Sequence, residues 1–294
     1  MGRRRELEIV VAALAAGRHI LLEGPPGTGK STLLRAVADE LGIGFEFVEG
    51  NAELTPARLV GHFDPARVLA EGYVAEIFED GPLVAALRDG SLLYVEEINR
   101  IPEETLNVLI TVMSEAELHV PRLGRVVATP GFRLVAAMNP FDAVGTARIS
   151  SAVYDRTCRL TMDYQDAADE RAIVVRGAGE AAAEDRWLHG VVDLVRRTRH
   201  HPDLRIGSSV RGAIDTVVVA ARLGALRGRS PQSVEVGLDA ALVALSGRVR
   251  VRDGSGRTSE DVIRELWGSV FGGSDGDAGK GGAPEGATTS SSNS

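Results

Sequence analysis

The feature that most constrains this 294-residue chain is a glycine-rich loop that ends in a lysine. Residues 24–31 read GPPGTGKS and fit G-x-x-x-x-G-K-[ST], the pattern of loops that cradle nucleotide phosphates. Lys30 is one of only two lysines in the chain, and the other, Lys280, lies in a Gly/Ser-rich tail. A compact ammonium on a flexible stem can reach between phosphates, where a planar guanidinium would not fit in the same way.

The sequence on either side of this loop supports the same interpretation. Residues 19–23 have the pattern of a short buried strand, and residues 31–41 have apolar side chains at helical spacing. A loop between such elements presents backbone N–H groups and a helix N-terminus to phosphates, and Ser31 can ligate Mg²⁺. The alternative is a Gly/Pro turn between two core elements. The predicted nucleotide-binding residues are Gly24, Pro25, Pro26, Gly27, Thr28, Gly29, Lys30, Ser31 and Thr32.

Composition and charge exclude several other classes of protein. The net charge of −8 argues against a nucleic-acid partner recognised through its phosphates. No stretch approaches the roughly twenty apolar residues of a membrane span, so we expect a soluble cytoplasmic protein. The single cysteine, Cys158, rules out an internal disulfide framework, and we expect it to be buried.

Strand and helix patterns alternate along the first half of the chain. Helical patterns separate most of the strand candidates, which predicts parallel strands, right-handed crossovers and a three-layer α/β core with ligands at the carboxyl ends of the strands. Two hairpin-like pieces, 72–80 and 117–129, interrupt this scheme and are candidate surfaces for other proteins. The strand candidates are 19–23, 45–49, 91–96, 132–138 and 159–164.

The pattern changes after about residue 164, where segments with helical spacing follow one another. We therefore predict a nucleotide-binding α/β core over 1–165 and a small all-helical lid domain over 166–270. The remaining residues, 271–294, are mainly Gly, Ser, Thr, Asp and Ala and cannot form a core, so we expect a disordered tail.

Polar residues follow the third and fourth predicted strands. Glu96 and Glu97 end the third strand, and NTP hydrolysis needs one carboxylate to hold Mg²⁺ and another to polarise the attacking water. Asn139 ends the fourth strand, where an amide can orient that water or simply satisfy a turn before Pro140. The alternative for the two acids is a solvated strand end.

Taken together, these blocks resemble a known family. Five blocks follow one another in the order and approximate spacing of AAA+ ATPases, and the run Glu97-Ile98-Asn99-Arg100 and the two hairpins resemble the MoxR family. The similarity spans about residues 5–250. The blocks are 24–31, 92–100, 137–140, 155–156 and 206–211.

The resemblance implies a role for each matching residue. Lys30 and Ser31 correspond to the Walker A lysine and magnesium ligand, and Glu96 and Glu97 to the Walker B pair. Asn139 corresponds to sensor 1. Arg156 resembles the arginine finger that reaches a neighbouring subunit's γ-phosphate, with Arg148 as a nearby competitor, and Arg211 resembles sensor 2 on the lid. Without the order of the motifs, both would be interpreted as surface or salt-bridging arginines.

Two positions depart from the family pattern. Many AAA+ proteins carry Asp where this chain has Glu96, which moves the carboxylate by about one bond length and puts the Mg²⁺ geometry and turnover rate in question. Thr157 stands where the family usually has Phe after the Asp-Arg pair, so the packing that positions Arg156 is expected to differ.

The resemblance implies an ATP- and Mg²⁺-dependent, chaperone-like remodelling ATPase that assembles into a homo-oligomer, with a hexameric ring as the expected form. Family members often act with a von Willebrand factor A (VWA) domain partner. Two alternatives remain open: a magnesium-chelatase-like motor subunit for cofactor insertion, and a nucleotide-gated binding module that does not hydrolyse ATP.

Overall fold

The computed structural model describes residues 2–140, 149–182 and 185–272. The chain divides into two compact units, Met1–Asp169 and Glu170–Ser294. The candidate finger Arg148 and residues 273–294 of the predicted tail lie outside the described residues. The domain boundaries expected from the sequence stay predictions.

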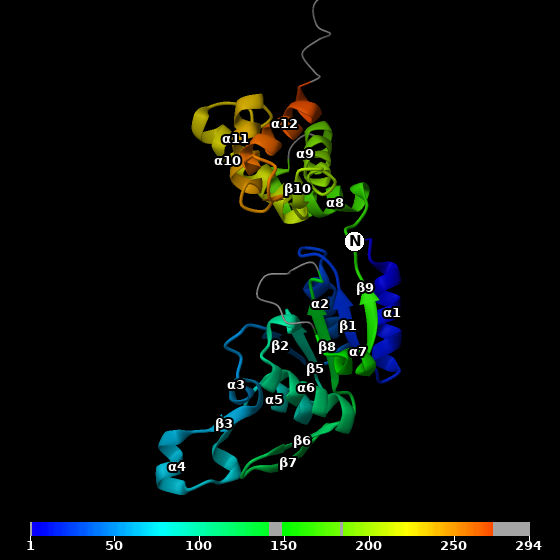
Figure 1. Cartoon of the computed structure of the whole chain (residues 1–294), viewed down its shortest axis with the longest axis vertical. Helices are drawn as coiled ribbons and strands as arrows, with labels where there is room; N and C mark the ends of the chain where they lie inside the picture. The colour runs from blue at the N-terminus through cyan, green and yellow to red at the C-terminus, as the bar shows by residue number, and fades with distance from the viewer. Residues whose placement is uncertain (1, 141–148, 183–184, 273–294) are drawn as a thin grey trace, which may run out of the picture. The chain divides into compact units, whose positions relative to one another are not determined.

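A parallel sheet forms the centre of the first unit (Figure 1). Within the described residues its strand order is β2-β5-β8-β1-β9, so the strand that enters the glycine loop, β1, lies between two neighbours. In the register, Glu23 on β1 pairs with Met138 on β8, and Glu49 on β2 pairs with Glu96 on β5. The carboxyl ends therefore reach one edge of the sheet together. The strands are β1 His19–Glu23, β2 Phe45–Glu49, β5 Leu92–Glu96, β8 Arg133–Met138 and β9 Thr157–Thr161.

Helices cover both faces of this sheet, because apolar side chains point alternately to either side of each strand. On β1, Ile20 and Leu22 pack in one buried cluster with α1 and α2, whereas Leu21 packs in another with α3, α5, α6 and α7. The three-layer α/β core predicted from the sequence is thereby confirmed. The helices are α1 Arg4–Ala15, α2 Lys30–Leu41, α3 Pro56–Val60, α5 Pro82–Asp89, α6 Glu103–Glu115 and α7 Ser151–Arg156.

Two inserts extend from the core and lie side by side (Figure 1). The first pairs β3 (Gly61–Phe63) with β4 (Phe78–Asp80), and α4 (Pro65–Glu71) and the 3₁₀ turn η1 (Ala75–Ile77) lie between them. The hairpin predicted over 72–80 was therefore wrong in extent. The Asp64 carboxylate caps α4 by accepting from the Ala66 N–H at 2.9 Å, so a helix fills the connection.

The second insert was predicted correctly as a hairpin. Its strands are β6 (Glu117–Val120) and β7 (Gly124–Val127), which pair antiparallel. The guanidinium of Arg122 in its turn lies 3.9 Å from the ring centroid of Tyr73 in the first insert. This cation–π contact ties the two inserts to each other.

The edge strand β9 differs from its prediction. It covers Thr157–Thr161 instead of 159–164, and Cys158 is exposed although burial was expected. On this strand the buried cluster reaches only Leu160, so the first residues of the strand lie beyond it.

The second unit is mainly helical, but it is not all-helical as predicted. Leu204–Ile206 (β10) pairs antiparallel with Arg250–Val251 (β11), which the helical periodicity of the surrounding segments did not reveal. Its last helix runs to Phe271, so the first residue of the predicted tail is helical. The other elements are α8 Ala167–Ala178, η3 Gly179–Ala181, α9 Asp185–Thr198, α10 Val210–Arg227, α11 Val234–Leu245 and α12 Ser259–Phe271.

A helix must be both long and apolar to span a membrane. Among the helices that the structure describes, none combines the length and the apolar character needed to cross a bilayer.

One histidine contributes directly to the sheet. The Nδ1 atom of His19, at the start of β1, accepts a hydrogen bond from the Leu134 N–H at 2.9 Å. Burial, and then the neighbouring charge of Arg133, lowers the pKa of His19 to about 4. The folded protein therefore keeps this imidazole neutral.

We predict that this histidine makes the first unit sensitive to acid. The unfolded chain takes up a proton near the ordinary pKa of 6.5, whereas the folded chain resists protonation to about 4, so stability present above pH 6.5 is lost as pH falls toward 4. The loss should be on the order of 2 kcal/mol after allowance for partial exposure. Chemical denaturation of His19→Gln should show a flatter pH dependence, whereas exposed His200→Gln should follow the wild type; equal slopes for all three proteins would refute the assignment.

Candidate functional site

The glycine loop follows the central strand β1 and leads into α2. Gly27 and Gly29 have φ angles of 75° and 85°, in the left-handed region that favours glycine. A Cβ added at Gly29 would meet nothing within 4 Å, so this glycine is needed for its backbone conformation and the space beside it is open. At Gly24 a Cβ would lie 2.0 Å from the Met162 carbonyl oxygen, so the loop begins at a close approach of two backbones.

Lys30 is the first residue of α2, and only 8% of it is exposed. Its ammonium donates to the carbonyl oxygens of Gly24 at 2.9 Å and Pro25 at 3.0 Å. Hydrogen bonds are needed to hold a buried cation, and here the loop's own backbone supplies them. The positive charge is thus fixed at the loop, where an anion would bind.

Ser31 and Glu96 meet at the carboxyl edge of the sheet. Ser31 Oγ donates to Glu96 at 3.1 Å from Oε1 and 3.3 Å from Oε2, and it lies 3.3 Å from the Tyr94 hydroxyl. Tyr94 precedes Glu96 by two residues and therefore points to the same face of β5, toward α2. Burial raises the pKa of Tyr94, so it stays a neutral hydroxyl. Hydroxyl and carboxylate oxygens are ligands that Mg²⁺ prefers, so this pair fits that ion.

Glu97 begins the turn η2 (Ile98–Arg100) that follows β5. Its φ of 53° and ψ of 43° lie in the left-handed region, which is unusual for a residue with a side chain. Its Oε2 atom lies 3.4 Å from Arg100 Nε, an ion pair across the turn. Backbone strain of this kind concentrates at functional sites, and here it turns Glu97 away from the strand direction.

Gly50, which the sequence analysis did not single out, makes this turn possible. Its N–H donates to the Glu96 carbonyl at 2.7 Å. A Cβ at this position would lie 2.3 Å from the Glu97 carbonyl oxygen and 2.9 Å from that of Glu96. The only signal in the sequence is a glycine directly after strand β2.

Asn139 directly follows β8, the strand between β1 and β5. The preceding residue, Met138, pairs with Glu23 and accepts a hydrogen bond from the Gly24 N–H at 3.2 Å. Asn139 is half-buried at the same edge as the loop and the paired acids. The first unit thus assembles Lys30, Ser31, Glu96, Glu97 and Asn139 from three neighbouring strands.

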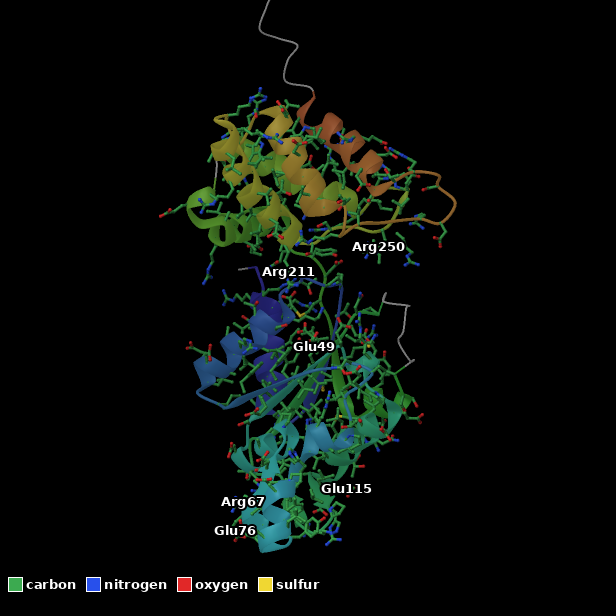
Figure 2. The ribbon with its side chains drawn as sticks, turned by 90° about the vertical axis from the view of Figure 1, so that its left-hand side faces the viewer. Glu49, Arg67, Glu76, Glu115, Arg211 and Arg250 are labelled. Carbon is green, nitrogen blue, oxygen red and sulfur yellow. The ribbon has the colours of Figure 1, made fainter. Side chains whose placement is uncertain are left out.

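The structure does not bring Arg156 into this assembly. It is the last residue of α7, where its Nη1 donates to the Ala152 carbonyl at 3.0 Å and its Nε contacts Ser114 on α6. Its side chain is 32% exposed. Arg211 is an exposed residue near the start of α10 in the second unit (Figure 2) and stays a predicted site residue.

Arg3 is a second residue near the loop that sequence reasoning missed. Its Nη2 donates to the Thr28 carbonyl at 3.0 Å and also contacts the Asp163 carbonyl, while Nη1 pairs with Glu6 at 2.7 Å. Burial alone would raise the pKa of Glu6, but the Arg3 hydrogen bond and nearby arginine charges lower it overall. Because Arg3 stands in a run of three arginines, nothing in the sequence distinguishes it.

Comparison with known proteins places this site in a family. Residues 19–157 match the family described as AAA domain (dynein-related subfamily). The gas vesicle ATPase GvpN of Ancylobacter aquaticus is 30% identical over 276 residues, covering 86% of this chain and 72% of that protein. The chain belongs to the AAA family. An uncharacterized protein of Staphylococcus epidermidis is 30% identical over 209 residues, covering 69% of this chain and 78% of that protein.

A solved structure supports the fold of the AAA protein. The Holliday junction branch migration motor RuvB of Thermotoga maritima has a TM-score of 0.56 and 19% identity, covering 82% of this chain and 67% of that chain. At this identity the likeness concerns the fold alone.

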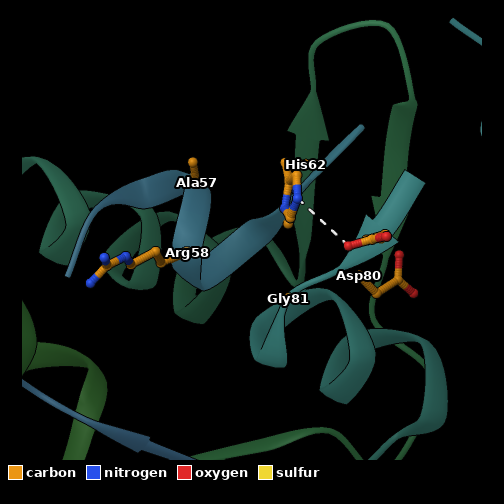
Figure 3. Close-up of a pocket in the computed structure, with 7 residues that line it drawn as sticks. Ala57, Arg58, His62, Asp80 and Gly81 are labelled. Carbon is orange, nitrogen blue, oxygen red and sulfur yellow. Dashed lines mark ion pairs between the residues drawn. The ribbon is translucent and has the colours of Figure 1, made fainter. Parts of the chain in front are cut away.

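A shallow pocket of about 320 Å³ lies on the AAA domain at the base of the first insert (Figure 3). Arg58, His62 and Asp80 line it, and His62 pairs with Glu79 at 3.6 Å. None of its lining residues belongs to the glycine loop or to the ends of β5 and β8, so this pocket is not the nucleotide site.

We predict that Gly50→Ala destabilises the AAA domain by about 1–3 kcal/mol, because the new methyl group overlaps the backbone of Glu96 and Glu97. Urea denaturation measures the loss. Gly268→Ala in α12 is the matched control, since a Cβ there meets nothing within 4 Å, and it should not destabilise. A Gly50→Ala variant as stable as the wild type would contradict the close contact.

Proposed function

We propose that this AAA protein hydrolyses ATP with Mg²⁺ and uses the cycle to remodel a partner protein or complex in the cytoplasm, as MoxR-type ATPases do. The observation that carries the proposal is the 3.1 Å contact between Ser31 and Glu96, beside the buried ammonium of Lys30. The groups proposed to bind phosphate and metal are therefore adjacent in the fold.

In this proposal, the glycine loop and the start of α2 bind the phosphates. The open space beside Gly29 and the left-handed backbone leave room for phosphate oxygens near the loop N–H groups and the positive end of the helix. Lys30 would exchange its hydrogen bonds to the Gly24 and Pro25 carbonyls for phosphate oxygens. A charge-assisted hydrogen bond to an anion is stronger than one to a neutral carbonyl, which favours the exchange.

The metal ligands in this proposal are Ser31 and Glu96. A bound Mg²⁺ would supply positive charge to the phosphate oxygens. The longer side chain of Glu96, compared with the Asp common in AAA+ proteins, already reaches Ser31 Oγ. This contact supports Glu96 as a competent ligand despite the extra methylene.

Glu97 and Asn139 are the groups proposed to act on water. Glu97 polarises the attacking water by accepting its hydrogen bond, and the ion pair with Arg100 at 3.4 Å keeps the carboxylate oriented. Asn139, at the end of the neighbouring strand, orients the same water through its amide.

Arg156 is proposed to act in a neighbouring subunit of a homo-oligomeric, hexameric ring. Its contacts with Ser114 and Ala152 lie on α6 and α7, and its guanidinium is partly exposed. An arginine that serves the next subunit requires a head-to-tail interface, which closes into a ring. Thr157, in place of the usual Phe, donates to the Val153 carbonyl at 2.8 Å, so the turn after α7 is held by a hydrogen bond.

Motion would connect hydrolysis to the partner. Arg211 is proposed as the lid arginine, sensor 2, which responds to the nucleotide. The two inserts are proposed to contact the client: Leu69 on α4 is 91% exposed, and Tyr73 is 49% exposed. A VWA-domain protein is the proposed partner.

A role at gas vesicles is a second candidate, favoured by the 30% identity to GvpN over 86% of this chain. Electron microscopy of a deletion strain of the source organism separates it from a role elsewhere. The remaining alternatives are the magnesium-chelatase-like motor and the nucleotide-gated binding module that does not hydrolyse ATP. Measurements of ATP binding and phosphate release distinguish this binding module from an ATPase.

We predict that Lys30→Ala loses ATP binding, whereas Glu97→Gln binds ATP but hydrolyses it at least about 100-fold more slowly. Nucleotide binding by calorimetry and phosphate release measure the two effects. Glu115→Gln, an exposed change of the same kind on α6, should leave both unchanged. If the assembled wild-type protein binds ATP but releases no phosphate at any protein concentration, the protein is a nucleotide-gated binding module and not an ATPase.

We predict that Arg156→Ala lowers ATP hydrolysis by about 10³-fold or more and leaves ATP binding intact, because a finger acts on developing charge. Mixing this variant with Lys30→Ala should restore activity, since each lacks what the other supplies. Inactive mixtures that co-assemble by native mass spectrometry would reject action in trans.

A further inference from the structure

Glu23, the last residue of β1, holds a buried carboxylate immediately before the phosphate loop. It is 3% exposed. Its Oε1 accepts from the Tyr154 hydroxyl at 3.0 Å, and its Oε2 accepts from Arg159 Nε at 2.6 Å. Both oxygens are therefore bonded, as a buried charge requires. Tyr154 and Arg159 lie more than a hundred positions later in the sequence, on α7 and β9.

The strand end that carries Glu23 cannot shift independently of the loop. The Glu23 carbonyl accepts from the Met162 N–H at 2.7 Å, and the next residue, Gly24, donates to the Met138 carbonyl at 3.2 Å. A Cβ at Gly24 would lie 2.0 Å from the Met162 carbonyl oxygen, so the two backbones are in direct contact. Movement of the loop is therefore felt at the Glu23 carboxylate.

Tyr154 and Arg156 share the short helix α7 (Ser151–Arg156). Val153, directly before Tyr154, is fully buried in the core, and Arg156 Nη1 bonds back to the Ala152 carbonyl at 3.0 Å. Because α7 is only about one and a half turns long, its residues move together. The bond from the Tyr154 hydroxyl to Glu23 therefore anchors the same short helix from which Arg156 extends.

We propose that the hydrogen bond from Tyr154 to Glu23 positions Arg156 for the neighbouring subunit and links that arginine to the phosphate loop of its own subunit. Tyr154 and Glu23 are positioning residues, since neither is among the residues proposed to bind the nucleotide. The inference rests on the proposed role of Arg156 in trans. It adds a series of contacts within one subunit, from that subunit's own phosphate loop to the arginine that acts on the next subunit.

Tyr154→Phe tests the link, because it removes one hydroxyl from a residue that is already 40% exposed. Misplacing a catalytic group by about 1 Å costs about 10²-fold, so we expect ATP hydrolysis to fall about ten- to a hundredfold, less than for Arg156→Ala. ATP affinity should stay within about twofold, because the loop itself is intact. Thr111→Val on α6 is the matched control, because it also removes one hydroxyl from an exposed residue, and it should match the wild type.

Mixing distinguishes a positioning role from general damage to the variant's own site. Tyr154→Phe keeps a sound nucleotide site, and Lys30→Ala keeps a sound Arg156, so a one-to-one mixed ring should recover about a quarter of wild-type activity from statistically paired interfaces. Glu23→Gln, which keeps the volume but loses the charge, should show the same loss and the same recovery.

The outcomes are separable. If Arg156→Ala is rescued by Lys30→Ala but Tyr154→Phe and Glu23→Gln are not, the defect lies in their own sites and the link is wrong. Wild-type hydrolysis by Tyr154→Phe also overturns it. If Arg156→Ala co-assembles with Lys30→Ala but activity is not restored, both the finger assignment and this inference are wrong. ATP binding and hydrolysis by the wild type would still support the proposed function.

Discussion

The proposed nucleotide site depends on the contact between the first turn of α2 and the end of β5. Ser31 Oγ reaches Glu96 at 3.1 Å and the Tyr94 hydroxyl at 3.3 Å, so a helix that starts at the loop is held against a strand two places away in the sheet. Tyr94 is fully buried and stays neutral, which gives Ser31 a fixed neighbour under the carboxylate. Any change in the register between β5 and its neighbours would separate the two halves of the site.

Several backbone conformations at this same edge restrict which residues can occupy them. Glu97 has a positive φ, Gly29 is left-handed, and Gly24 and Gly50 approach other backbones too closely for a side chain. The sheet below is regular and closely packed, with Leu21, Leu93 and Leu134 fully buried. Strain of about 1–3 kcal/mol at a position can persist only when the surroundings determine the conformation, and the sheet provides that support.

The sequence revealed those parts of the site that depend on local spacing. The glycine loop is contiguous, and the alternation along β5 places Glu96 on the α2 face, so both were predictable from pattern alone. Contacts between distant segments were not. Glu23 bonds to Tyr154 across 131 positions, and Arg3 bonds to the Thr28 carbonyl across 25. For the same reason, the partner strand of β4 and the β10–β11 pair were missed: strand pairing over a long connection leaves no periodic signal.

The proposed transfer of Arg156 to a neighbouring copy has an energetic consequence within each chain. Its guanidinium is bonded to Ala152, in contact with Ser114 and 3.7 Å from the Asp155 carboxylate, so a phosphate in the next subunit must compete with two neutral acceptors and one ion pair. The Asp155 side chain is 84% exposed, so this ion pair is weak. Charge-assisted bonds to phosphate are stronger than bonds to a carbonyl or hydroxyl, so the exchange is favourable once the copies are assembled. In a single chain, however, the present contacts hold the arginine on α6, away from its own loop. Hydrolysis would then be confined to the assembled state, because the isolated chain keeps its finger engaged elsewhere.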